Sequence, residues 1–276
     1  MPKPLRSMLK KGENNPPKEK EPGTELLFRI GKEGREVKQV HQLSLRLQTI
    51  ASEVPKESRL ADIGTDHAQL PVALMGVERI RYAVASDAKA GPFQTALRNV
   101  EAAGFSDAIS VRHGEGLQTL EVSDHIDVIS IAGMGGSLIT NILSKGANQL
   151  ASVQRLILQP NMAADMVREW LYENEWTLIK EQIVQEEQFY EVLIATKEKG
   201  ENHQHAYRNK NWDDAILFGP KLLEKKPEAF QLKWKQELDH LERVLQQMEA
   251  TLQRTEIGEE RERIKNRIKR IREVIK

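Results

Sequence analysis

The sequence contains no cysteine, so disulfide bonds, thiol nucleophiles and cysteine-based zinc sites are excluded. Aromatic residues make up only 5% of its 276 residues, so large ring side chains contribute little to any core. No apolar run reaches the roughly 18 residues of a membrane span, and no N-terminal segment resembles a secretory signal. We therefore expect a cytoplasmic protein that uses neither a membrane nor a metal ion.

The chain also lacks a net charge, but its charges are unevenly distributed. Residues 1–40 carry 10 basic and 6 acidic side chains, residues 41–200 carry 14 and 21, and residues 201–276 carry 17 and 14. An acidic central region cannot hold a polyanion by its bulk charge, so an RNA partner would be bound by local basic faces or by the terminal segments. Simple solvation of exposed helices accounts for the same imbalance.

A glycine turn follows a predicted strand at residues 59–63, and a helix is predicted to begin just beyond it. This order builds a nucleotide-type cofactor site at the carboxyl end of the first strand of an open α/β sheet. Gly64 permits the tight turn, but Asp66 stands where a dinucleotide-binding turn has its second glycine. A carboxylate there would repel a pyrophosphate, so the turn favours a cofactor without phosphates, such as S-adenosylmethionine, over a nicotinamide dinucleotide.

Acidic residues also end the next predicted strands. Asp87 lies about 20 residues beyond the glycine turn, the spacing at which an acid meets ribose hydroxyls. Glu115 follows a third strand, and a fourth strand runs into the glycine-rich turn at residues 133–136. Together these strand ends predict the cofactor-binding residues Asp62, Gly64, His67, Asp87, Gly114, Glu115, Ala132, Gly133 and Met134.

The alternation of strands and helices predicts an α/β fold with a mostly parallel, seven-stranded, Rossmann-like sheet. A final strand pair at 177–185 and 189–196 supplies one antiparallel strand, which is typical of class I methyltransferases. The other predicted strands are 59–63, 80–86, 109–112, 126–131 and 155–159, and the predicted helices are 39–54, 67–76, 91–103, 135–150 and 162–174.

Three motifs give the sequence a family resemblance: Asp62–Pro71, Ile131–Gly136 and Leu156–Asn161. In this order they resemble the bacterial TrmK family, whose members methylate N1 of the adenosine at position 22 of tRNA. The resemblance covers about residues 43–197 and does not include the first 40 or so. It implies S-adenosylmethionine as cofactor, tRNA as partner and a helical C-terminal appendage.

We divide the chain into a disordered N-terminal extension (1–38), a methyltransferase domain (39–199), and a linker with a helical coiled-coil domain (200–276). A polar linker spans residues 200–211, and Gly258 marks a turn between two helices. Apolar residues then recur at alternating steps of four and three, which predicts a helical hairpin. The hairpin can close on itself in a monomer or pair in a coiled-coil dimer. Its seam residues are Trp234, Leu238, Leu241, Leu245, Met248 and Leu252, then Ile264, Ile268, Ile271 and Ile275.

The second hairpin helix is rich in basic residues, which predicts a grip on the tRNA phosphate backbone. An ordinary coiled coil with solvated flanks, or a dimer interface, is the alternative interpretation. The residues assigned to RNA are Arg261, Lys265, Arg267, Lys269, Arg270 and Arg272.

Methyl transfer to adenine N1 needs orientation more than a strong base, because N1 has its own lone pair. A carboxylate at the N6 edge would accept the N6 hydrogens and stabilise the positive charge of the product. Asp66 is the candidate, although a helix N-cap is an alternative role for it. Asn161, at the end of the fifth strand, is a second catalytic candidate that could bind a base edge, with simple turn formation as its alternative.

Two other functions stay open at this point. One is a non-catalytic RNA-binding coiled-coil protein with a vestigial methyltransferase fold. The other is a nicotinamide-dependent oxidoreductase, against which Asp66 argues.

Overall fold

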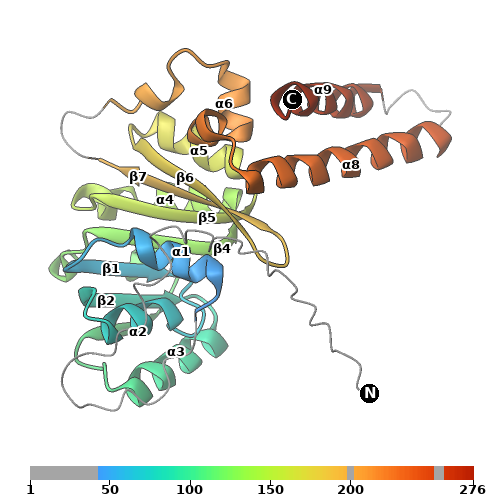
Figure 1. The fold of residues 1–276 in the computed structure, drawn as a ribbon. Coiled ribbons are helices and arrows are strands. Elements are labelled where there is room, and N and C mark those ends of the chain that lie inside the picture. Colours follow the sequence, from blue (N-terminus) through green and yellow to red (C-terminus); the bar gives the residue numbers. More distant parts are fainter. Residues whose placement is uncertain (1–42, 198–201, 252–257) are drawn as a thin grey trace, which may run out of the picture.

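A seven-stranded sheet forms the centre of the protein (Figure 1), seen in a computed structural model that describes residues 43–197, 202–251 and 258–276. The predicted extension 1–38 therefore lies outside the described residues. The strand order is β3-β2-β1-β4-β5-β7-β6. The strands are β1 (Ser58–Ile63), β2 (Ile80–Asp87), β3 (Ile109–His113), β4 (Val128–Gly135), β5 (Arg155–Met162), β6 (Thr177–Gln185) and β7 (Phe189–Thr196).

The direction of the strands confirms the predicted sheet. Strands β1 to β5 pair in parallel, whereas β7 runs antiparallel to both β5 and β6. The chain order changes direction across the neighbouring strands β1 and β4, so a ligand crevice is expected at the carboxyl ends of these strands.

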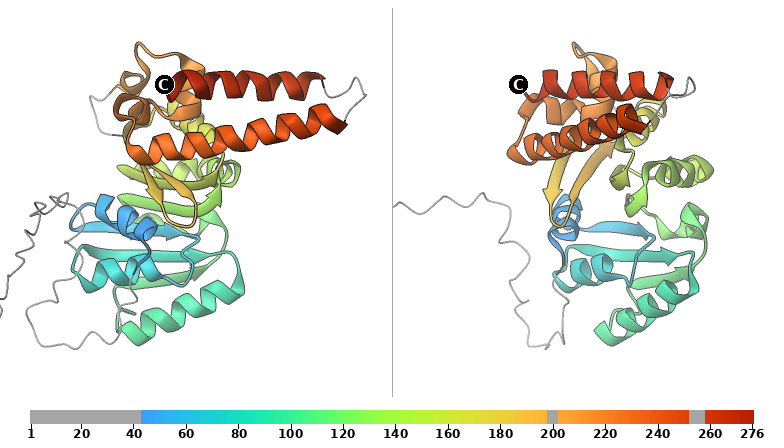
Figure 2. Two further views of the ribbon diagram at one scale, coloured as in Figure 1. Left: turned by 45° about the vertical axis from the view of Figure 1, so that its right-hand side comes forward. Right: turned by 90° about the vertical axis from the view of Figure 1, so that its right-hand side faces the viewer.

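Helices cover both faces of the sheet (Figure 2). Strand residues that alternate in sequence enter different cores, as Leu60 and Ala61 do. One core contains residues of α1 (Leu45–Glu53), α2 (Gln69–Gly76) and α3 (Ala90–Ala103). The other contains residues of α4 (Gly136–Lys145) and α5 (Ala164–Glu173). This burial on both faces explains why the central strands are apolar runs.

The other predicted helices agree with the structure to within two residues at each end, but two differ by more. The helix expected at 39–54 begins at Leu45, because Ser44 caps it and accepts a hydrogen bond from the Leu47 N–H at 3.3 Å; residues 39–42 are not described. The helix expected at 135–150 ends at Lys145 and a 3₁₀ turn follows at Ala147–Ala151. A Cβ at Gly146 would lie 2.4 Å from the Leu117 side chain, so the close approach at this junction requires glycine.

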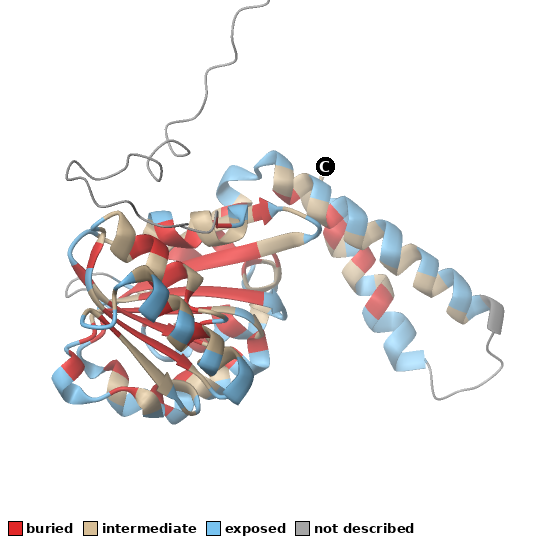
Figure 3. Ribbon diagram, turned by 90° about the horizontal axis from the view of Figure 1, so that it is seen from below, coloured by how far each residue is buried: buried red, intermediate tan, exposed pale blue. Residues whose placement is uncertain are grey.

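The C-terminal helices attach at the β6 side of the sheet. They are α6 (Trp212–Phe218), α7 (Pro220–Lys225), α8 (Glu228–Thr251) and α9 (Gly258–Val274). Helices α8 and α9 lie side by side and antiparallel (Figures 1 and 2), with Ile264, Ile268 and Ile271 of the predicted seam buried. Away from the sheet the pair is mostly exposed (Figure 3). Its assignment as a coiled coil stays a prediction.

The predicted linker is partly integrated into the main core. Ala206 and Tyr207 lie in a 3₁₀ turn and are buried in the same core as α4 and α5. Ala215 of α6 joins them there, so α6 is anchored to the sheet domain. None of the described helices has the length and apolar character needed to cross a bilayer.

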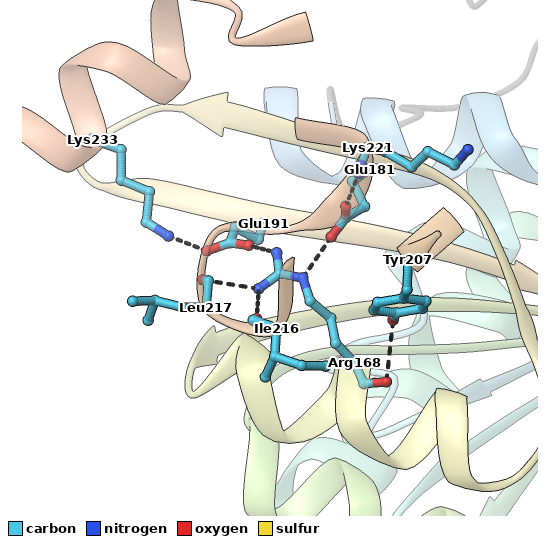
Figure 4. A network of polar contacts seen from close by, with 8 residues as sticks. All are labelled: Arg168, Glu181, Glu191, Tyr207, Ile216, Leu217, Lys221 and Lys233. Atoms are coloured by element: carbon cyan, nitrogen blue, oxygen red, sulfur yellow. Dashed lines mark hydrogen bonds and ion pairs between the residues drawn. The ribbon is translucent and has the colours of Figure 1, made fainter. Parts of the chain in front are cut away.

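A buried ionic network connects the sheet to these C-terminal helices (Figure 4). Arg168 of α5 is fully buried and donates to Glu181 of β6 at 2.6 Å and to Glu191 of β7. It also donates to the backbone oxygen of Ile216, at 3.0 Å, in α6. Lys233 of α8 pairs with Glu191 from the other side.

The two glutamates of this network have different pKa shifts. Burial alone would raise the pKa of Glu191, but Arg168 and Lys233 outweigh burial and lower it to about 2. Burial raises the pKa of Glu181, whose partners are the Arg168 guanidinium and the Lys221 backbone N–H. Ionised Glu191 therefore stabilises the fold at neutral pH, and this contribution is lost as the pH falls from 4.5 towards 2.

We predict that Arg168→Met strongly destabilises the protein, because Glu181 then loses its buried counter-charge and Glu191 keeps only Lys233. The expected loss in the free energy of unfolding is about 3–5 kcal/mol, measured by urea denaturation. The control is Arg81→Met, which removes an exposed pair with Glu57 and should cost less than about 1 kcal/mol. Equal small losses in both variants would show that the network contributes little.

Candidate active site

A cavity of about 840 Å³ opens at the carboxyl ends of β1, β2 and β4, where the strand order predicts a ligand crevice. His67 is not among its lining residues: its half-exposed ring lies 3.5 Å from the Asp66 carboxylate. The catalytic candidate Asp66 lines the cavity, whereas Asn161 lies outside it. The predicted cofactor residues that line it are Asp62, Gly64, Asp87, Gly114, Glu115, Ala132, Gly133 and Met134.

Asp62, at the end of β1, is a buried carboxylate held by two hydroxyls. Ser130 of β4 and Thr65 of the turn each donate to it at 2.6 Å. Burial raises the pKa of Asp62, and these two hydrogen bonds oppose the rise. The carboxylate therefore ties the glycine turn to the neighbouring strand and fixes the floor of the cavity.

Gly64 is favoured by its backbone angle, and it lies against the end of the Met134 side chain. Its φ is +71°, and an added Cβ would lie 2.1 Å from the Met134 Cε. The next turn residues, Asp66, His67 and Ala68, also have positive φ values. Because α2 begins only at Gln69, with Ala68 at the N-cap position, the alternative that Asp66 caps this helix is wrong. The Asp66 carboxylate is instead 79% exposed at the cavity.

The second strand contributes polar groups suited to a ribose. One oxygen of Asp87 accepts the Lys89 N–H at 2.8 Å, which leaves the other oxygen able to accept a hydroxyl. Ser86 lines the same cavity, and its buried Oγ has no hydrogen-bond partner among the described residues. Buried polar atoms in native structures are usually hydrogen-bonded, so this hydroxyl suits a polar ligand group or a water molecule in the cavity. The side chains of Leu117, Leu138 and Ile142 line the cavity and can cover a flat apolar ring.

Sequence reasoning missed a polar network at the ends of β4 and β5. The fully buried Gln159 accepts from Arg46 of α1 at 2.6 Å and from the Gly133 N–H at 3.1 Å. Gln159 in turn donates to Asn161 at 3.0 Å, and Asn161 donates to the Gly133 carbonyl at 2.9 Å. No local sequence pattern points to Arg46, which lies 113 positions away from Gln159. Asn161 therefore holds the glycine-rich end of β4 in place; residues 133–135 continue this strand with an irregular register, so the turn predicted at 133–136 is wrong.

The six residues assigned to RNA lie on α9, and five of them are in ion pairs. Arg272 pairs with Glu242 of α8 at 2.7 Å, and Arg270 pairs with Asp213 of α6 at 2.6 Å. Arg261, Lys265 and Arg267 have weaker contacts with glutamates, at 3.4–3.9 Å. Lys269 is exposed and forms no ion pair with any described residue. Part of the basic surface therefore serves to join the helices.

The fold and the site together define a class of protein. A seven-stranded sheet with β7 antiparallel, and with an acid-lined cavity at the ends of β1, β2 and β4, is the architecture of Rossmann-like methyltransferases.

Known proteins narrow this class to one family. Residues 60–273 match the family model of tRNA (adenine(22)-N(1))-methyltransferase. The chain is 39% identical over 235 residues to the tRNA (adenine(22)-N(1))-methyltransferase of Bacillus subtilis, covering 85% of this chain and 97% of that protein. The chain belongs to this tRNA (adenine(22)-N(1))-methyltransferase family.

Solved structures agree with this assignment. The B. subtilis m1A22 tRNA methyltransferase TrmK superposes with a TM-score of 0.78 at 38% identity, over 85% of this chain and 99% of that one. The Streptococcus pneumoniae protein Sp1610, in complex with S-adenosyl-L-methionine, superposes with a TM-score of 0.74 at 37% identity, over 85% and 100%.

Substitution of Gly64 tests how tightly the cavity floor is packed. We predict that Gly64→Ala costs more stability than Gly104→Ala, whose φ is +75° but whose added Cβ meets open space. The backbone strain should cost about 1–2 kcal/mol in both variants, and displacement of Met134 should add about 0.5–1.5 kcal/mol at Gly64 only. The measurement is urea denaturation. In the Met134→Ala background the difference between the two glycine variants should disappear; its persistence would contradict the proposed contact.

Proposed function

We propose that this protein transfers a methyl group from S-adenosylmethionine to N1 of the adenosine at position 22 of tRNA. The main support is the cavity at the ends of β1, β2 and β4. Its lining includes the glycine turn after β1, the Asp87 carboxylate and Ser86, whose hydroxyl has no hydrogen-bond partner among the described residues. Family membership supports the choice of acceptor. Because the substrate is tRNA, we place the activity in the cytoplasm.

Methyl transfer to unmodified tRNA tests this function directly. The protein is incubated with labelled S-adenosylmethionine, and the modified nucleoside and its position are identified by mass spectrometry. We expect 1-methyladenosine at position 22. Cofactor binding without transfer would favour a non-catalytic RNA-binding protein, and binding of NAD in place of S-adenosylmethionine would favour an oxidoreductase.

The cavity residues would hold the cofactor by complementary groups. Asp87 would accept the ribose hydroxyls, Ser86 would supply a hydroxyl at the same strand end, and Glu115 would face the adenine amino group. Gly64 and Gly133 would let the backbone approach closely. When bound, the cofactor supplies a methyl group on an already activated sulfonium, so the protein contributes mainly proximity and orientation.

Asp66 and Asn161 are the proposed catalytic residues. The exposed Asp66 carboxylate at the cavity can accept hydrogen bonds from the adenine N6 amino group and take its proton once N1 is methylated. Asn161 lies on the other side of the glycine-rich end of β4, where its amide is oriented by Gln159 and Gly133. It would bind the base edge, or position the strand end that does.

The helical region would engage the rest of the tRNA. Residues 39–199 would form the catalytic domain and residues 200–276 the linker and RNA-binding part. The cations of α9 support this division, since they form a basic surface beside a buried isoleucine seam. Because α8 and α9 already pair with each other, we favour a monomer over a coiled-coil dimer.

Removal of the Asp66 carboxylate should impair catalysis and spare cofactor binding. We predict that Asp66→Ala lowers kcat about 100-fold, the usual scale for one charge-stabilising group, while Asp66→Asn, which keeps one acceptor oxygen, loses less. The Kd for S-adenosylmethionine, measured by calorimetry, should be unchanged. The control is Asp107→Ala, an exposed aspartate outside the cavity. Full activity of Asp66→Ala would refute the catalytic role.

Lys269 tests the basic surface without disturbing helix packing. We predict that Lys269→Ala weakens tRNA binding and reduces the slope of log K against log salt by about 1, as loss of one phosphate contact should. The control is Lys56→Ala, an exposed lysine just before the amino end of β1. Identical salt slopes in both variants and the wild type would exclude Lys269 from the RNA contact.

A further inference from the structure

A second cleft, of about 400 Å³, lies between the sheet domain and the helical pair. We call it the β5–α8 cleft. One wall is the end of β5 and the start of α5, with Phe189 and Glu191 of β7; the other wall is formed by α8 and α9. Its lining includes Met162, Phe189, Lys233, Trp234, Glu237 and Arg267.

The β5–α8 cleft adjoins the cofactor cavity through β4 and β5. Asn161 lines the cleft, and its amide bonds to the carbonyl of Gly133, which lines the cavity. In the same sheet pairing, Gly135 of the cavity lies opposite Met162 of the cleft. A polymer with one unit in the cavity would therefore have a neighbouring unit near the cleft.

Two hydrogen-bond donors in the cleft walls are unmet. Trp234 is 3% exposed, and its Nε1–H has no hydrogen-bond partner among the described residues. The buried Nε–H of Arg267 likewise lacks a partner there, although the guanidinium pairs with Glu237 at 3.4 Å. Each unmet buried donor costs about 1–3 kcal/mol, so a ligand that supplies acceptor atoms would relieve the cost.

The charges of the walls select an uncharged ligand. Lys233 and Arg267 are each paired with a glutamate, and Asp165 adds a further carboxylate. A phosphate in the cleft would thus face the carboxylates of Asp165, Glu191 and Glu237. The two cations there, Lys233 and Arg267, are already paired. A nucleobase has acceptor atoms without charge, and its flat face can lie against Phe189 and the 72%-exposed Met162.

We propose that the β5–α8 cleft binds the base of a nucleotide flanking the target adenosine, with Trp234 and Arg267 donating to its edge. This inference rests on the proposed tRNA methylation. Unstacking of a neighbouring base into the cleft would present the adenosine to the cavity, and it would read the sequence beside the target.

A double-mutant cycle between protein and RNA tests the inference. Trp234→Phe removes the N–H but keeps a ring against Phe218, whose ring centre is 4.6 Å away. The RNA change is an abasic nucleotide at position 21 or at position 23. The control protein is Trp212→Phe on α6, which does not line the cleft. The readout is the Kd for tRNA, together with the Kd for S-adenosylmethionine.

We expect Trp234→Phe to weaken binding of intact tRNA roughly 5- to 10-fold, the scale of one buried hydrogen bond, with cofactor binding unchanged. One of the two abasic tRNAs should bind the wild-type protein more weakly than intact tRNA does. For that abasic tRNA, Trp234→Phe should not raise the Kd any further. An unchanged Kd in Trp234→Phe, or equal losses on intact and abasic tRNA, would overturn the proposal.

Two further outcomes are separable. The effect of Trp234→Phe could instead be coupled to a methylphosphonate linkage in the RNA and not to an abasic site. That result would mean that the cleft binds a phosphate and not a base, and it would overturn the proposal. Because the cycle measures binding, it is read independently of turnover. Absence of 1-methyladenosine with the wild type would instead refute the proposed function.

Discussion

The buried Arg168 guanidinium is the interaction on which the geometry of the molecule depends. It reaches Glu181 and Glu191 on neighbouring strands and the backbone of α6, while Lys233 ties α8 to the same carboxylate (Figure 4). A buried charge without partners is strongly destabilising, so these elements must pack together or not at all. The network thereby holds α6 and α8 against the sheet. The position of the β5–α8 cleft beside the cavity follows from that constraint.

The cavity depends on a second constraint, the close approach of the turn after β1 to the end of β4. Asp62 holds the turn to Ser130, and Gly64 leaves room for Met134 of the strand. A Cβ at Gly64 would displace the end of the Met134 side chain, which lines the cavity. The acid at Asp66 is then presented on a left-handed stretch of backbone in place of a helix end, which keeps its carboxylate exposed to a substrate. Positive φ at non-glycine residues is costly, and such strain is characteristic of functional sites.

The sheet could be predicted from the sequence, because each strand is a local run of apolar residues bounded by turn residues. The final pair at 177–185 and 189–196 is confirmed residue for residue. The acids Asp62, Asp87 and Glu115 could also be predicted as site residues. They lie near the ends of predicted strands, and the carboxyl ends of parallel strands lie close together. The partnership of Arg46 with Gln159 and the unmet donor of Trp234 depend on tertiary packing, and no local pattern encodes them. The stop at Gly146 likewise depends on a distant side chain, Leu117.

The distribution of charge does not by itself account for selective binding of a polyanion. Most cations of α9 already face carboxylates of α8 or α6, so they hold the helices more than they attract RNA. Long-range attraction alone would then give weak and unselective binding. Selectivity has to come from uncharged contacts close to the reacting base. Buried hydrogen-bond donors there favour a nucleotide that supplies acceptor atoms over one that leaves the donors unpaired. The unmet donors of Trp234 and Arg267 lie in that position, on a wall whose distance from the cavity is fixed by Arg168. The same buried network that stabilises the fold thereby sets which nucleotide can lie beside the target.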